Sequence, residues 1–156
     1  MLTNEVKNNI ERSVLCWLAT VDQNGCPNVS PKEVFAADGE SRMLIANIAS
    51  PESVRNIQFN ANVCVSFIDV FIQKGFKLRG RAIVIAKSDP RFGPMATPLI
   101  AITKGTFPIH SIIEIQVTDV AQILAPSYRL IPGATEEAQI KSAMATYGVC
   151  QRPSDT

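Results

Sequence analysis

The chain has 156 residues, which suits one domain; its N-terminus lacks a signal-peptide pattern and no apolar run is long enough to span a bilayer, so a cytoplasmic protein is expected. Hydrophobic residues make up 46% and charged residues 19%, a composition that supports a packed core and excludes intrinsic disorder. The net charge of +1 gives no reason to expect nucleic acid or a membrane as a partner.

The first third of the chain is predicted to form a helix and three strands. Residues 3–13 favour a short helix, and residues 14–21 are a β-rich apolar run of the length of a buried strand. A Gly-containing turn leads to the second strand, residues 27–36. Pro31 cannot donate to a ladder, so this strand needs a free edge or a bulge there. Residues 42–47 form the third strand.

A helix is expected over residues 50–59, directly after the third strand. Ser50 is placed to cap it, and Pro51 falls at the first helical position, where a missing N–H costs nothing. Ser53 lies one turn in, beside the same free amides. Because a helix N-terminus carries partial positive charge, these two hydroxyls make it a candidate phosphate site. An ordinary capped helix is the alternative.

The rest of the chain is predicted to add three strands and two helices. The strands cover residues 63–69, 76–87 and 110–117. Gly80, in the middle of a strand, indicates a kink or the close approach of another group. Prolines and glycines limit residues 91–102 to an interrupted helix. A last helix begins near residue 134 and ends at Gly148, and a mobile tail is expected at residues 151–156.

Six strands joined mostly by short turns, with peripheral helices, predict a mainly β fold: a small closed or half-closed antiparallel barrel. The connections are too short for a βαβ pattern. With no repeat and no linker, residues 1–150 are expected to form a single domain.

No catalytic or metal-binding pattern stands out. His110 is the single histidine, which excludes a His-rich metal site, and the four cysteines include no Cys-x-x-Cys pair. Paired carboxylates, a Cys–His pair, a triad and the phosphate-binding glycine motifs are all absent. No metal is predicted, and the catalytic residues stay unidentified.

Several segments, in this order and spacing, resemble the pyridoxamine 5′-phosphate oxidase-like family of FMN-binding split barrels. They are residues 18–22 with Gly25, residues 27–32, residues 44–47, Ser53 with Asn56, residues 63–67 and residues 75–80. The resemblance extends from about Val14 to Val117. It implies a six-stranded antiparallel split barrel and a homodimer that holds FMN in grooves at its interface.

Carried over residue by residue, the resemblance implies that two strands line the flavin. Ser30, Pro31 and Lys32 would lie along the isoalloxazine ring. The end of the third strand would line the ring and ribityl chain through Ile45, Ala46 and Asn47. Flat apolar rings are bound by strand side chains and backbone donors, so this placement is physically coherent.

For the phosphate, the resemblance implies Ser50 and Ser53 at the helix start. Lys77, together with Arg79, would approach either the phosphate or the ring edge from the fifth strand. A dianionic phosphate is bound by cations and amides. Glu52 departs from the family, which commonly has Lys before the hydroxyl residue, and a carboxylate there would repel phosphate by about 1 kcal/mol or more.

The function implied is an FMN-dependent oxidoreductase that passes hydride or electrons to a small acceptor, with the chemistry supplied by the flavin. The alternative is a non-catalytic module that binds or stores a flavin, haem or another cofactor. Oxidation of pyridoxamine phosphate itself is not expected, because Arg152 is the one basic residue in residues 147–156.

Overall fold

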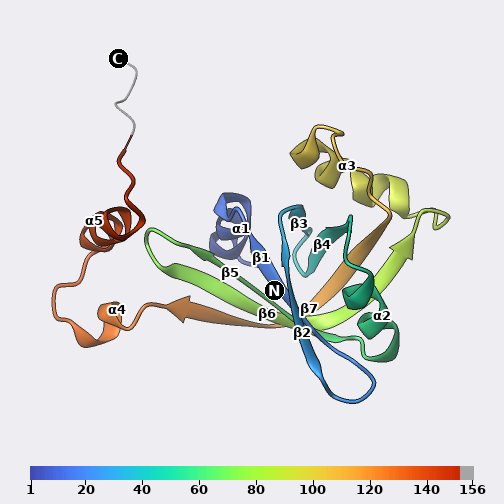
Figure 1. Cartoon of the computed structure of the whole chain (residues 1–156), viewed down its shortest axis with the longest axis horizontal. Coiled ribbons are helices and arrows are strands. Elements are labelled where there is room, and N and C mark those ends of the chain that lie inside the picture. The colour runs from blue at the N-terminus through green and yellow to red at the C-terminus, as the bar shows by residue number, and fades with distance from the viewer. Residues whose placement is uncertain (152–156) are drawn as a thin grey trace.

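A computed structural model describes residues 1–151. Its strands are β1 (Cys16–Val21), β2 (Pro27–Lys32), β3 (Phe35–Asp38), β4 (Arg42–Asn47), β5 (Asn62–Asp69), β6 (Lys74–Ala86) and β7 (Ser111–Leu124). The helices are α1 (Asn4–Arg12), α2 (Pro51–Phe59), α3 (Phe92–Thr103), α4 (Ser127–Leu130) and α5 (Glu136–Tyr147). The strands form one antiparallel sheet in the order β2-β1-β5-β6-β7-β4-β3, with the helices around it (Figure 1).

The sheet curls because its two edge strands are consecutive in the chain. Only Glu33 and Val34 separate β2 from β3, although β2 pairs with β1 and β3 pairs with β4. The amide of Ala46 donates to the carbonyl of Val34 at 2.9 Å, which fixes the crossing point. The prediction of one strand over residues 27–36 is therefore wrong. The chain must interrupt its hydrogen bonding with β1 before it can pair with β4. The described residues hold seven strands rather than six, and the antiparallel split barrel is confirmed.

Strand β4 is buried on both faces, which explains its continuous apolar sequence. Met43 and Ile45 point into the barrel core, while Leu44 and Ala46 pack with α3 in a second core cluster. The barrel core is filled by Leu18, Val65, Phe67, Leu78, Ile113 and Ile115, among others. Helix α1 contributes Val6 and Ile10 to that core.

Several local predictions are confirmed. Thr3 caps α1 by accepting a hydrogen bond from the Val6 amide, and β4 covers the predicted residues. Gly80 lies at a register shift, where an added Cβ would be 2.3 Å from the Gln116 carbonyl oxygen. The close approach expected there is the approach of β7.

Helix α3 has about the predicted extent but is not interrupted, and strand β7 is longer than predicted. Helix α3 continues through Pro98, because its packing against β4 and β7 offsets the lost hydrogen bond. Strand β7 continues to Leu124 because it pairs with the whole of β6, from Lys74↔Leu124 to Ala86↔Ser111.

Beyond β7, α4 and α5 form a C-terminal arm beside the tip of the β5–β6 hairpin (Figure 1). The Tyr128 hydroxyl donates to the Ile72 carbonyl at 2.7 Å, and Lys74 pairs with Glu136 at 2.6 Å. Gly148, at φ 66°, ends α5 as predicted. Most of the tail expected to be mobile, residues 152–156, lies outside the described residues. Within residues 1–151, none of the helices has the length and apolar character needed to cross a membrane.

Candidate functional site

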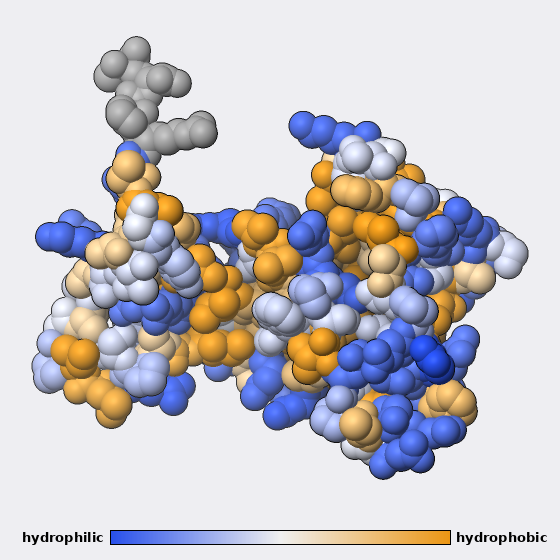
Figure 2. Space-filling view, in the orientation of Figure 1, coloured by the Kyte–Doolittle hydropathy of each residue, from blue (hydrophilic) through white to orange (hydrophobic). Residues whose placement is uncertain are grey.

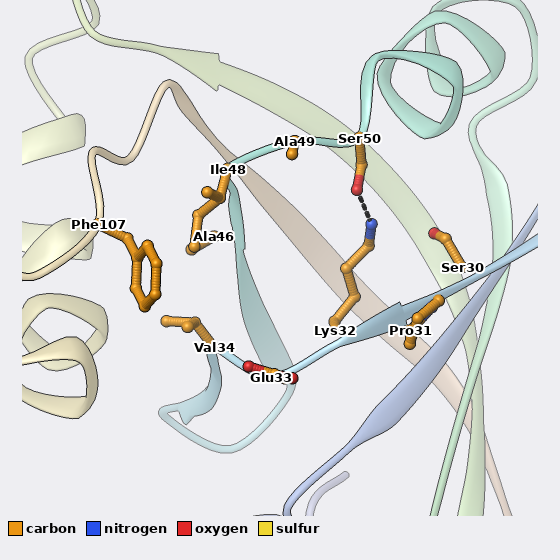
Figure 3. A pocket seen from close by; sticks show the side chains of 10 residues that line it. All are labelled: Ser30, Pro31, Lys32, Glu33, Val34, Ala46, Ile48, Ala49, Ser50 and Phe107. Atoms are coloured by element: carbon orange, nitrogen blue, oxygen red, sulfur yellow. Dashed lines mark hydrogen bonds between the residues drawn. The ribbon is translucent and has the colours of Figure 1, made fainter.

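A groove of about 400 Å³ lies where the ends of β2 and β4 meet the start of α2 (Figure 3). Its polar lining residues are Ser30, Lys32, Glu33 and Ser50. Its apolar end is formed by Val34, Ala46, Ile48 and Phe107. Ser30, Pro31, Lys32, Ala46 and Ser50 were all predicted to bind a cofactor, and the fold brings these five to one cavity.

Lys32 is a buried cation without an acidic partner. Only 5% of the residue is exposed, and its Nζ donates a hydrogen bond to Ser50 Oγ (Figure 3). No carboxylate of residues 1–151 forms an ion pair with it. Burial lowers the pKa of Lys32, and burial raises the pKa of the neighbouring Cys16 to about 12, so that thiol stays neutral at physiological pH. Within residues 1–151, no carboxylate lies at ion-pair distance from this ammonium, although Glu33 lines the same groove.

Ser50 does not cap α2, contrary to the prediction. Its backbone, at φ −130° and ψ 64°, is not in the extended conformation of a capping residue, and its side chain makes no capping hydrogen bond to the helix. The Ser50 hydroxyl instead accepts from Lys32, and the Ser50 amide donates to Asn47 Oδ1 at 3.2 Å. The start of α2 therefore lies uncapped beside an unpaired cation, and both features favour an anion.

The rest of α2 is fastened to the β1–β2 hairpin by a polar ladder. The ladder connects alternate residues of β2, and Thr20 of β1, with polar residues of α2 and with Ser50 just before it. Its members are Asn28, Ser30, Lys32, Ser50, Ser53, Asn56 and Thr20. Ser30 and Ser53 share a hydroxyl–hydroxyl hydrogen bond of 2.9 Å, and Asn56 Nδ2 donates to Thr20 Oγ1 at 3.1 Å. The Ser53 hydroxyl is thus directed at Ser30 and 99% covered, rather than open to the groove.

Other predicted site residues lie elsewhere. Ile45 is fully buried in the barrel core, and Asn47 Nδ2 donates to Ser111 Oγ at 2.9 Å. Lys77 and Arg79 lie on the outer face of β6, and neither lines the groove. Arg79 forms an ion pair with Asp119 at 2.8 Å. Contact of Lys77 or Arg79 with a ligand in the groove therefore requires a second protomer.

Two residues change the expected chemistry. Glu52 is exposed and lines a different depression, together with Asp22 and Arg55, so its carboxylate does not face the groove. Phe107, from the loop after α3, lines the groove without having been predicted to do so. No local pattern identifies it, because its place depends on how α3 packs.

The chain is similar to known proteins both in sequence pattern and in fold. The sequence pattern of the pyridoxamine 5′-phosphate oxidase family matches residues 2–124, while no curated protein matches. HupZ of Group A Streptococcus is 21% identical, with a TM-score of 0.68 over 80% of this chain and 96% of that one. An FMN-binding protein from Syntrophomonas wolfei is 14% identical, with a TM-score of 0.67 over 78% and 85%. HutZ of Vibrio cholerae, a haem storage protein, is 18% identical, with a TM-score of 0.61 over 79% and 94%.

These structures share the fold at low sequence identity, and the ligands named for two of them, FMN and haem, differ. The family match is more specific, because it begins before α1, covers all the strands of the described sheet and ends at the last residue of β7. This protein belongs to the pyridoxamine 5′-phosphate oxidase family.

Proposed function

We propose that the protein binds FMN in the groove, with the phosphate against Lys32 and the start of α2 and the flavin ring toward the apolar end. We further propose that it acts as an oxidoreductase toward a small acceptor. Lys32 is the observation that carries the proposal. A buried ammonium without a carboxylate destabilises a fold, so its retention is explained by an anionic ligand that neutralises it.

The dimensions and polarity of the groove support this ligand. Its volume of about 400 Å³ is in the range of small-molecule sites, and one end is polar while the other is apolar. FMN has the same division between phosphate and ring. When bound, the flavin supplies the redox chemistry, and the residues of this chain hold and orient it and exclude water.

Haem fits the groove less well. The side chains that ligate haem iron are His, Cys, Met and Tyr. None of them is among the described residues that line the groove. We therefore favour flavin over haem as the cofactor.

A homodimer is part of the proposal. Trp17 and Val29 lie diagonally on the same outer face of the β1–β2 hairpin, opposite Pro31 and Ala19 respectively, and are 46% and 56% exposed. Val14, Leu15 and Phe71 are also exposed, and a second cavity of about 380 Å³ includes them together with Trp17. Figure 2 shows further apolar side chains gathered between the C-terminal arm and the barrel. Exposed apolar surface of this extent is typical of an interaction site, and a second copy is the partner proposed.

A comparison of the affinities for FMN and for riboflavin, which lacks the phosphate, tests the identity of the ligand and the placement of its phosphate. Wild-type protein should bind FMN more tightly, as followed by flavin fluorescence. Lys32→Met should weaken FMN binding by about 10- to 100-fold and leave riboflavin binding unchanged, because one charge-assisted hydrogen bond to phosphate is lost. Lys87→Met, at an exposed residue beyond β6, is the matched control. Equal FMN affinity in Lys32→Met and wild type would contradict the placement of the phosphate.

Reduction of the FMN-loaded protein by NADH or NADPH, with turnover of an added acceptor, tests the enzymatic part. A protein that holds FMN but shows no turnover with a panel of donors and acceptors is a flavin carrier. That outcome would be consistent with the proposed binding site and would contradict the proposed oxidoreductase activity.

A further inference from the structure

We infer that Phe107 is a specificity-determining residue, whose phenyl ring stacks on a planar aromatic part of the ligand and so selects aromatic phosphates over aliphatic ones. The inference rests on the proposed function, because the probe that tests it is FMN. It adds to that function the part of the ligand, a planar aromatic ring, that the apolar end of the groove recognises.

Phe107 occupies a position where packing does not require an aromatic residue. Its side chain lies across the apolar end of the groove from Val34 and Ala46 (Figure 3), and the residue is 53% exposed. Contacts between the α3 region and the barrel are made by buried residues instead, among them Leu99 and Ile109. Phe107 is the one aromatic residue among those described as lining the groove. A half-exposed phenyl ring at the mouth of a cavity is available to cover a ligand.

The loop that carries Phe107 is anchored on both sides. Helix α3 ends at Lys104 in the left-handed conformation, at φ 51°, and the Thr106 amide donates to the Thr103 carbonyl at 3.0 Å. On the other side the His110 amide donates to the Asn47 carbonyl at 2.9 Å. Phe107 is therefore presented between two fixed points, which lowers the entropy lost when it covers a ligand.

The same anchor connects the two ends of the groove. The backbone carbonyl of Asn47 accepts the His110 hydrogen bond that anchors the Phe107 loop. The side-chain oxygen of Asn47 accepts a hydrogen bond from the amide of Ser50 at the polar end. Asn47 therefore fixes the position of Phe107 relative to Lys32 and Ser50. A ligand whose phosphate binds Lys32 and Ser50 extends toward the Phe107 side chain. Aromatic rings prefer offset-stacked or edge-to-face contacts, so a planar ring at the apolar end gains a contact that an aliphatic chain does not.

Variants at residue 107 separate stacking from simple apolar contact. Phe107→Leu keeps an apolar side chain but removes the ring, and Phe107→Trp keeps an aromatic one. Ile102→Ala is the matched control, since Ile102 is an exposed apolar residue of α3 that does not line the groove. All four proteins should unfold at similar temperatures, because both positions are about half exposed.

Titration with FMN, riboflavin and inorganic phosphate tests the inference. Phe107→Leu should bind FMN and riboflavin about 5-fold more weakly, by equal factors, and keep the wild-type affinity for phosphate. Phe107→Trp should retain wild-type affinity for FMN and quench the fluorescence of the bound flavin, and Ile102→Ala should match wild type throughout.

The failures are distinguishable. If Phe107→Leu binds FMN as wild type does, while Lys32→Met has lost FMN affinity, the role of Phe107 is overturned and the FMN proposal stands. If wild-type protein binds neither FMN nor riboflavin, both are overturned. If Phe107→Leu weakens phosphate binding as strongly as FMN binding, the loop supports the anion site and the stacking inference is wrong.

Discussion

Strand β2 presents a polar face that is covered and an apolar face that is exposed. Ser30 and Lys32 bond to Ser53 of α2 and to Ser50 just before it, and Asn28 of the same face bonds to Thr20, whereas Val29 faces solvent on the same side as Trp17 of β1. A strand at a protein surface usually has the reverse pattern, with apolar residues inside.

The difference between these two faces shows that covering a polar face needs complementary partners. On the inner face, hydroxyl and amide groups of α2 match the groups of β2 through the polar ladder, so most of the buried groups are satisfied. The Lys32 charge is the exception, and it points to a ligand. On the outer face the exposed apolar residues point to a partner. The following variants would break or sharpen this comparison.

The largest effect is expected on the outer face. Trp17→Asp should raise the dimer dissociation constant by ~100-fold or more, since it places a carboxylate in the apolar patch. Light scattering over a range of micromolar concentrations measures this. Phe59→Asp, at an exposed aromatic residue of α2, is the control and should leave the dimer intact. Wild-type protein that is monomeric at these concentrations would remove the dimer from the proposal.

On the inner face, Asn56→Ala should lower the free energy of unfolding by about 2 kcal/mol. The change removes a buried amide that donates to Thr20 and leaves a small cavity. Asn62→Ala is the control, because Asn62 is exposed and its change should stay within about 0.5 kcal/mol. Urea unfolding of both variants measures the difference, and equal losses would mean that the ladder adds no stability.

Lys32→Met should change stability in the opposite direction. Without ligand, the free energy of unfolding should rise by about 1 kcal/mol at neutral pH, because a buried uncompensated charge is replaced by an apolar chain. Addition of FMN should stabilise the wild type more than the variant at matched concentrations, because the variant binds FMN more weakly. A loss of stability in Lys32→Met would indicate that the ammonium supports the fold itself.

The pH dependence of that difference follows from the lowered pKa of Lys32. Between the folded-state pKa and the value of about 10.5 for an unburied lysine, the unfolded chain binds a proton that the folded chain does not. Wild-type stability relative to Lys32→Met should therefore rise with pH through this window, and the gap between the two proteins should narrow. Unfolding measured between pH 7 and pH 10.5 tests the sign. A gap that widens with pH would mean that the folded-state pKa is raised.

The smallest effect is expected for the charged residues on the outer face of β6. Arg79→Ala should lower the free energy of unfolding by no more than about 0.5 kcal/mol, because its ion pair with Asp119 is exposed and screened by solvent. The effect should disappear in 1 M salt. Titration of the same variant with FMN examines the predicted contact of Arg79 with the ligand, which requires the partner protomer in a dimer. A loss of stability that persists in high salt would show that Arg79 packs rather than pairs.

Much of the fold was determined by local sequence patterns. The limits of β4, the helix that begins at Pro51, the close approach at Gly80 and the end of α5 at Gly148 all agree with prediction. Each depends on a short apolar run, on a proline or glycine at one position, or on residues a few places apart. The resemblance also predicted five residues that the fold assembles in the groove.

Tertiary structure alone decided the rest. The split of residues 27–36 into β2 and β3 follows from a change of pairing partner. The diversion of the Ser50 hydroxyl to Lys32, the burial of that lysine and the approach of Phe107 to the groove join segments far apart in the chain. A local pattern sets the conformation of a segment, but the neighbours that enclose a side chain come from the whole fold.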